Sequence, residues 1–306
     1  MDVELTSPSC LLLGLAQLDG QICQVGITLQ FPQIQLLARE SPALAVSGAR
    51  ADLAWRQAAH FFQQQHLPPR AEIEIELAIP QFMGLGSAAM LGLSVARALS
   101  TLHALPADDA AELARAIGLA DDEALEAHAF AQGGLLVVGE HGALLRRHAI
   151  AHQGEANDWV FVFVLPRPPG ATPETLEIDR RGALRAAARH LGAEMSSVIT
   201  ADLCPAAERD DIDTFAQALA RIQTLNQAAL ASAGQPATLT PQEQTILDIM
   251  RDASALTAGR ALAGLGLYGL IKGGGPSREL RRTLTERLGY FGGTVMASIC
   301  DNNGAR

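Results

Sequence analysis

The sequence predicts an α+β protein of two domains, residues 1–155 and 156–306, and two observations lead to this class. Segments with the two-residue period of a β-strand alternate with longer segments that have the period of a helix. The second half reads strand, helices, strand, helix, strand, which is compatible with a ferredoxin-like α/β sandwich. A chain of 306 residues is also long enough to bury the one or two cores that such a fold needs.

The first half is expected to begin with an antiparallel hairpin. Asp19-Gly20 separates two apolar segments and favours a tight turn between strands. Apolar residues at helical spacing, followed by glycine or proline, then define the helices. The strands expected here are 11–18, 24–31, 72–79, 135–139 and 143–150, and the expected helices are 51–65, 89–105, 108–118 and 121–132, with Asp108 as the cap of the third.

The second half is expected to follow a polar stretch, residues 151–157, where we place the domain boundary. The unbroken apolar run 159–165 predicts a fully buried strand. Further strands are expected at 267–272 and 294–299, and helices at 174–190, 212–231, 241–257 and 278–288.

Composition disfavours several classes of function. The formal charge of −10 opposes binding to a nucleic-acid backbone, and no run reaches the roughly 18 uncharged apolar residues of a membrane span. The N-terminal segment does not resemble a secretory signal, and the four scattered cysteines are typical of core residues in a reducing compartment. We therefore expect a cytoplasmic protein that binds neither nucleic acid nor membrane, whose partner is a small phosphorylated or anionic ligand. A homodimer is compatible with the sequence.

The most informative segment is a glycine-rich turn between an expected strand and an expected helix. Its residues are Gly84, Leu85, Gly86, Ser87, Ala88 and Ala89. Glycine permits positive φ, and the unpaired amides in the first turn of a helix bind oxyanions without any lysine. Glycines before a helix are also common in turns that bind nothing, so both interpretations stay open at this point.

The segment from Pro80 to Met90 resembles the second signature of the GHMP kinase superfamily, P-x-x-x-G-L-G-S-S-A-A. The proline, both glycines, the leucine, the first serine and the first alanine match. Met90 replaces the last alanine, and Ala88 replaces the second serine, whose hydroxyl helps to hold the magnesium ion of the nucleotide in that family. The resemblance implies a two-domain GHMP fold, with a ribosomal-protein-like N-terminal α/β domain and a ferredoxin-like C-terminal sandwich.

Four further segments match one branch of this superfamily. They are Phe130-Ala-Gln-Gly-Gly134 with the following Gly139-Glu-His141, Asp158-Trp159 through Pro166, Gly293-Thr-Val295, and Asn303-Gly-Ala305. Together they resemble the β-ribofuranosylaminobenzene 5′-phosphate (β-RFAP) synthases, which are built like the kinases but are not kinases. The chain departs from that branch at residues 9–13, 121–125 and 259–269, where cationic, hydroxyl or amide groups of the family are replaced. These departures indicate a divergent member.

Three functions are compatible with the resemblance. The first is transfer of a phosphoribosyl group from phosphoribosyl diphosphate to an aromatic acid, with loss of carbon dioxide and diphosphate. The second is phosphoryl transfer from ATP to a small alcohol, with ATP as a cofactor only in this case. The third is a noncatalytic homologue that binds a ligand. Mg²⁺ is a candidate cofactor, and the residues themselves indicate no metal cluster and no catalytic acid or base.

Other candidates for ligand contacts lie outside the glycine-rich turn. Arg167 follows the expected strand 159–165, at the end of a strand where ligands often bind. Gly273 and Gly274 begin a second glycine-rich turn, which is either an anion loop or an ordinary connection to a helix whose early position suits Pro276. Residues 140–148 and His128 are further candidates, for which a solvated hairpin and a core histidine are the simpler interpretations.

Overall fold

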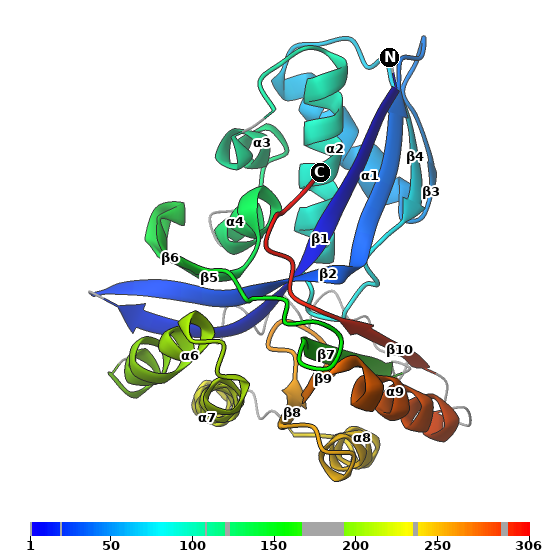
Figure 1. The fold of residues 1–306 in the computed structure, drawn as a ribbon. Helices are drawn as coiled ribbons and strands as arrows, with labels where there is room; N and C mark the ends of the chain where they lie inside the picture. Colours follow the sequence, from blue (N-terminus) through cyan, green and yellow to red (C-terminus); the bar gives the residue numbers. More distant parts are fainter. Residues whose placement is uncertain are drawn as a thin grey trace.

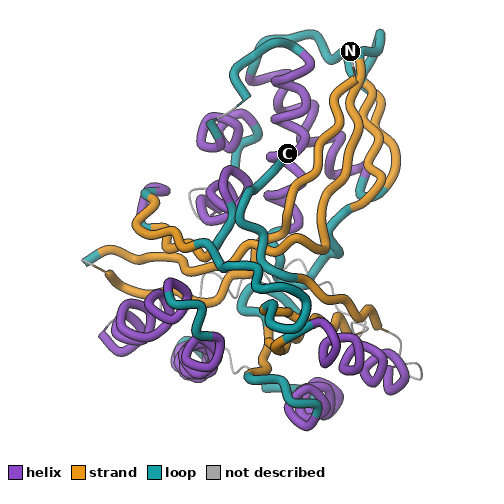
Figure 2. The backbone as a smooth tube through the Cα atoms, viewed as in Figure 1, coloured by secondary structure: helices purple, strands orange, loops and turns teal. Residues whose placement is uncertain are grey.

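The structure is a computed structural model that describes residues 2–18, 20–107, 109–119, 123–166, 193–234, 238–288 and 293–306. It confirms the α+β class, with two sheets and helices packed against each of them (Figures 1 and 2). The expected helix 174–190 and Arg167 lie outside the described residues.

The first sheet has six strands in the order β3-β4-β2-β5-β6, with β1 paired to β2. Its strands are β1 (Asp2–Leu18), β2 (Gln21–Arg39), β3 (Ala45–Gly48), β4 (Glu72–Leu77), β5 (Leu135–Val138) and β6 (Leu144–His148). The opening hairpin is confirmed, but it is longer than predicted because the alternation of residues 2–7 also forms strand. The long β2 pairs with β5 near its start, where Val25 faces Val137, and with β4 at its end, where Ala38 faces Ile73.

The second sheet has four antiparallel strands in the order β10-β7-β9-β8. They are β7 (Trp159–Pro166), β8 (Thr257–Arg260), β9 (Leu267–Lys272) and β10 (Gly293–Ser298). As predicted, β7 is buried on both faces. Phe161 and Phe163 face the main hydrophobic core, whereas Val162 packs in a smaller cluster under the last two helices.

Most helices begin and end close to their predicted limits. The N-terminal ones are α1 (Ala51–Gln64), α2 (Ser87–Leu102), α3 (Ala110–Ala116) and α4 (Ala124–Gln132), and the C-terminal ones are α6 (Cys204–Glu208), α7 (Ile212–Ser232), α8 (Pro241–Asp252) and α9 (Gly274–Leu288). The cap of α3 is Asp109, whose carboxylate accepts hydrogen bonds from the amides of Ala111 and Glu112, so the assignment of this cap to Asp108 was wrong. The predicted helix 241–257 ends early, because β8 begins at Thr257.

The chain returns to the first sheet after β10, as the red C-terminal segment in Figure 1 shows. Cys300 forms an isolated bridge with Leu29, and Arg306 exchanges two main-chain hydrogen bonds with Thr6. One hydrophobic cluster also runs through both sheets. The strand β6 belongs to the first sheet and β7 to the second, so the chain passes from one sheet to the other near the predicted boundary at residue 155. The division into two domains stays a prediction.

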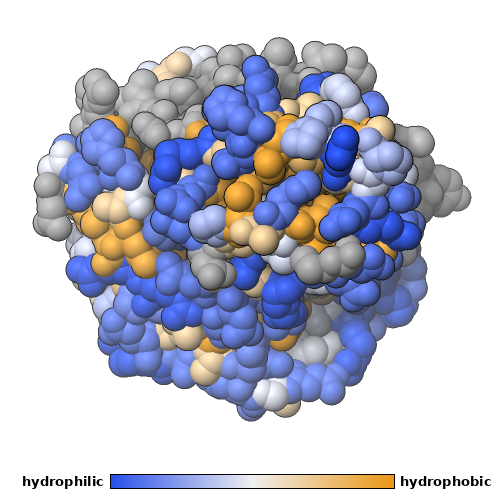
Figure 3. Space-filling model, turned by 90° about the horizontal axis from the view of Figure 1, so that it is seen from above, coloured by the Kyte–Doolittle hydropathy of each residue, from blue (hydrophilic) through white to orange (hydrophobic). Residues whose placement is uncertain are grey.

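The surface seen from above is mainly hydrophilic, with hydrophobic areas separated by hydrophilic side chains (Figure 3). Within the described ranges, no helix has the length and hydropathy needed to cross a membrane.

Candidate functional site

The glycine-rich turn at residues 84–89, here called the α2 turn, forms the start of α2. Gly84 and Gly86 have φ of 78° and 68°, in the left-handed region that favours glycine. Gly86 is the N-cap of α2 and no side chain caps this helix. The first helical hydrogen bond joins the amide of Met90 to the carbonyl of Gly86 at 2.9 Å, so the amides of the preceding turn have no partner within the helix. This is the main-chain geometry that binds oxyanions.

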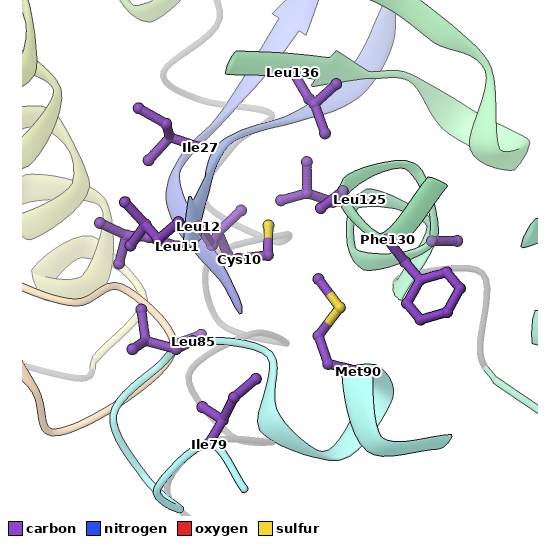
Figure 4. Close-up of a cluster of buried hydrophobic side chains, with 14 of the residues drawn as sticks. Cys10, Leu11, Leu12, Ile27, Ile79, Leu85, Met90, Leu125, Phe130 and Leu136 are labelled. Atoms are coloured by element: carbon purple, nitrogen blue, oxygen red, sulfur yellow. The ribbon is translucent and has the colours of Figure 1, made fainter. Parts of the chain in front are cut away.

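The α2 turn is held in place by the hydrophobic core beneath it. Leu85 and Met90 are 1% and 0% exposed, and both lie in the cluster that includes Cys10, Leu125 and Phe130 (Figure 4). The amide of Cys10 on β1 donates to the carbonyl of Leu85 at 3.2 Å. Met90, a departure from the kinase signature, is therefore a core residue that fixes the helix.

One side of the α2 turn is closed by the loop of residues 261–266, which joins β8 to β9. The amide of Leu265 donates to the carbonyl of Phe82 at 2.6 Å. A Cβ on Gly264 would lie 2.3 Å from the nitrogen of Gly84, and one on Gly266 would lie 2.5 Å from the carbonyl oxygen of Met83. The two main chains are thus in direct contact, which only glycine permits at these positions.

Arg260 anchors this loop from behind. Its guanidinium lies 3.6 Å from a carboxylate oxygen of Glu243, and the two side chains are 12% and 8% exposed. Its Nε also donates to the carbonyl of Gly264 at 3.4 Å. Burial lowers the pKa of Arg260, and the charge of Glu243 opposes that shift.

The open side of the α2 turn carries a cation that sequence reasoning missed. Nη1 of Arg50 donates to Oγ of Ser87 at 2.9 Å, and Nε2 of Gln57 donates to the carbonyl of Ala88 at 3.0 Å. Ser87 is half-buried and Ala88 is exposed, so this end of the turn is accessible. Arg50 lies just before α1, 37 residues from Ser87 in the chain, and no local pattern marks it.

A buried carboxylate borders the same turn. Glu126 on α4 is 3% exposed, and a Cβ on Gly86 would lie 2.8 Å from its Cγ and 3.5 Å from its Oε1. The sequence marks this residue only as the single acidic position of α4. A negative charge here opposes a bare anion and favours a ligand that brings a cation with it.

Among the candidates that lie in the described part of the chain, the others are not brought to the α2 turn. Gly273 and Gly274 lie where β9 leads into α9, and their amides donate to the carbonyls of Asp158 at 2.9 Å and Glu155 at 2.6 Å. Gly274 borders a cavity of about 410 Å³ whose lining includes no residue of the α2 turn. These hydrogen bonds support the interpretation of Gly273 and Gly274 as an ordinary connection to a helix, and not as an anion loop.

Two further candidates have structural partners of their own. Nε2 of His128 lies 2.7 Å from the carbonyl oxygen of Gly142, and Arg147 donates to three carbonyls, among them those of Gly133 and Asn302. Both side chains thus fix the hairpin and the C-terminal segment. Among the residues that the structure describes, no group of three or more His, Cys, Asp or Glu side chains is arranged to hold a metal ion.

Comparison with protein families matches residues 52–133 to the GHMP kinases N terminal domain, a range that includes the α2 turn and Glu126. The solved structure of L. major mevalonate kinase in complex with R-mevalonate superposes on the chain with a TM-score of 0.73 at 12% identity, covering 99% of this chain and 97% of that one. The whole chain therefore has the GHMP kinase fold.

Two curated relatives differ in how much of this chain they cover. A beta-ribofuranosylphenol 5′-phosphate synthase of Archaeoglobus fulgidus is 26% identical over 239 residues, which is 73% of this chain and 76% of that protein. A homoserine kinase of Synechococcus sp. is 42% identical over 72 residues, which is 22% of this chain and 24% of that protein. Both relatives have the names of transferase-type enzymes, and this chain is similar to each over the stated share of its length.

Proposed function

We propose that this protein is a transferase that resembles β-RFAP synthase and moves a phosphoribosyl group from phosphoribosyl diphosphate to an aromatic acid. The observation that carries the proposal is the extent of similarity. The synthase of Archaeoglobus fulgidus is similar over 239 residues, whereas the similarity to the homoserine kinase extends over 72. An uncapped helix start with Arg50 beside it gives the phosphorylated donor a place to bind.

The proposed step balances without an oxidant or a net proton. The bond between ribosyl C1 and the diphosphate oxygen breaks, and diphosphate leaves with the electron pair. The ring carbon that carries the carboxylate forms a bond to C1. The bond from that ring carbon to the carboxylate then breaks, its electrons restore the aromatic ring, and carbon dioxide leaves.

The residues around the α2 turn supply binding and charge for this step. The first-turn amides of α2, Oγ of Ser87 and the guanidinium of Arg50 hold a phosphate group of the donor. The carboxylate of Glu126 lies close enough to the turn to stabilise positive charge that develops on the ribosyl ring as diphosphate leaves, because buried charges interact strongly.

Mg²⁺ fits the oxygen donors at this turn. Glu126 and Ser87 offer a carboxylate and a hydroxyl, and Mg²⁺ is commonly held by one or two carboxylates together with substrate phosphates. When bound, the ion would neutralise charge on the diphosphate leaving group. Ala88 offers no ligand at the position where the kinase signature has its second serine.

A kinase that uses ATP is the alternative, and one observation favours it. The segment similar to homoserine kinase is more nearly identical, at 42%, than the longer segment similar to the synthase, at 26%. In that case Glu126 is the candidate general base for an alcohol. A noncatalytic homologue is the third alternative, supported by the aliphatic residues of the loop 261–266.

Thermal-shift titration separates these functions, because a ligand that binds the native state raises its melting temperature. We expect phosphoribosyl diphosphate with Mg²⁺ to stabilise the protein more than ATP or ADP does. Carboxyl-labelled 4-hydroxybenzoate or 4-aminobenzoate, incubated with the diphosphate, should then release labelled carbon dioxide. Stabilisation by adenine nucleotides alone would support the kinase, and stabilisation by none of these ligands would support the noncatalytic homologue.

The variant Glu126→Gln tests the role of the buried carboxylate. We expect it to bind phosphoribosyl diphosphate more tightly than the native protein in the absence of Mg²⁺, because a repulsive charge is removed, and to lose release of carbon dioxide. Glu112→Gln, on the neighbouring helix α3, is the exposed control and should change neither property. Unchanged turnover in Glu126→Gln would contradict this role.

A further inference from the structure

A second cavity lies at the opposite end of α2 from the α2 turn. It is open to solvent and has a volume of about 620 Å³, within the usual range for a small-molecule site. Its lining comes from three places: the loop after β2, one residue shortly before β4, and the C-cap of α2. The lining residues are Glu40, Ser41, Pro42, Arg70 and His103.

The charged side chains that line this cavity are exposed, and one buried nitrogen atom beside it lacks a hydrogen-bond partner. Nε2 of His103 is shielded from solvent and has no hydrogen-bond partner, although buried polar atoms are nearly always paired. The ring of His103 is held edge-on against Phe62 at 5.5 Å between centroids, so its place is fixed. Among the described residues, the side chains of Glu40 and Arg70 form no ion pair or hydrogen bond.

We propose that this cavity binds a small zwitterion of the amino-acid type. Arg70 supplies a guanidinium for a carboxylate, and Glu40 supplies a carboxylate for an ammonium group. The hydroxyl of Ser41 adds a hydrogen bond, and the ring of His103, fixed against Phe62, forms part of the wall. A simple anion would meet the charge of Glu40 and a simple cation would meet that of Arg70, so a ligand with both charges fits this lining best.

The cavity is separate from the proposed transferase site. The helix α2 has 16 residues, which places its two ends about 24 Å apart. The α2 turn lies at its start and His103 caps its end. Binding at this cavity therefore does not depend on the reaction proposed for the α2 turn.

Three compounds with one carbon skeleton test the charge requirement. L-Leucine carries both charged groups, 4-methylpentanoate lacks the amine and 3-methylbutylamine lacks the carboxylate. Each is titrated into the full chain at constant ionic strength, with thermal shift and calorimetry as readouts. We expect L-leucine to raise the melting temperature and to bind at least tenfold more tightly than either of the other two.

Variants locate the binding. Arg70→Gln and Glu40→Gln should each weaken L-leucine binding at least tenfold, whereas His103→Phe, which keeps a ring against Phe62, should change it less than about twofold. Arg56→Gln, at an exposed position on α1, is the matched control and should bind normally. Equal binding of 4-methylpentanoate, normal binding by Arg70→Gln, or no binding of L-leucine would each overturn the proposal.

Discussion

Two glycine-rich turns lead from a strand region into a helix in this protein, and they differ in what surrounds their amides. At the α2 turn, Gly86 caps the helix without a side-chain hydrogen bond, and Arg50 and Glu126 lie beside it. At the turn of residues 273–275, here called the α9 turn, the carbonyls of Glu155 and Asp158 already accept hydrogen bonds from the glycine amides. The same local sequence signal thus produces one candidate binding site and one structural connection.

The comparison shows why a glycine turn alone does not identify an anion site. Main-chain donors bind a ligand only where the rest of the fold leaves them without a partner. At the α9 turn the preceding polar stretch folds back and supplies carbonyl oxygens, and Arg278 is paired with Glu155. At the α2 turn a neighbouring loop closes one side only, and the other side stays accessible.

The largest expected effect is on the loop that closes the α2 turn. Arg260→Met should reduce the free energy of unfolding by about 3 kcal/mol, because it leaves the carboxylate of Glu243 buried without its cation. Arg278→Met, at the exposed ion pair of the α9 turn, should cost less than about 1 kcal/mol. Chemical denaturation measures both values, and equal losses would contradict the difference between the turns.

A smaller loss of stability is expected where the two main chains touch. Gly264→Ala should destabilise the protein by about 2 kcal/mol, because the added methyl group would lie 2.3 Å from the nitrogen of Gly84 and the main chains would have to move apart. The displaced turn should also bind phosphoribosyl diphosphate more weakly. Denaturation and ligand titration on the same variant measure the two effects, and native values in both would show that the contact is dispensable.

The third prediction concerns affinity more than stability. Arg50→Met should weaken binding of phosphoribosyl diphosphate about tenfold, which is the loss expected for one charge-assisted hydrogen bond. Arg278→Met, beside the α9 turn, should leave the affinity unchanged. Calorimetric titration of both variants makes the comparison. An equal loss in Arg278→Met would mean that the ligand contacts the α9 turn instead.

The smallest effect is expected at the α9 turn itself. A Cβ on Gly275 would meet no atom within 4 Å, so Gly275→Ala should change the free energy of unfolding by less than about 0.5 kcal/mol. The affinity for phosphoribosyl diphosphate should not change. Denaturation and titration together check this, and a loss of affinity would reopen the α9 turn as a ligand site.

Local sequence patterns predicted most elements, but they failed where an element is short or its ends depend on partners. The four-residue strands β3 and β8 were missed, since Ala45–Gly48 and Thr257–Arg260 contain small residues and glycine rather than a strand pattern. β8 forms because its neighbour β9 pairs with it. The start of α9 at Gly274, four residues before the predicted one, likewise depends on the carbonyl of Glu155.

The sequence by itself determined the alternation of strands and helices and the position of the α2 turn, because glycine conformation and hydrophobic periodicity act over a few residues. Only the tertiary structure decided which residues surround that turn. Arg50, Glu126 and the loop 261–266 are distant along the chain and meet Ser87 and Gly84 through sheet pairing and core packing. Whether a main-chain amide stays unpaired and can bind a ligand depends on these long-range contacts, which no local pattern encodes.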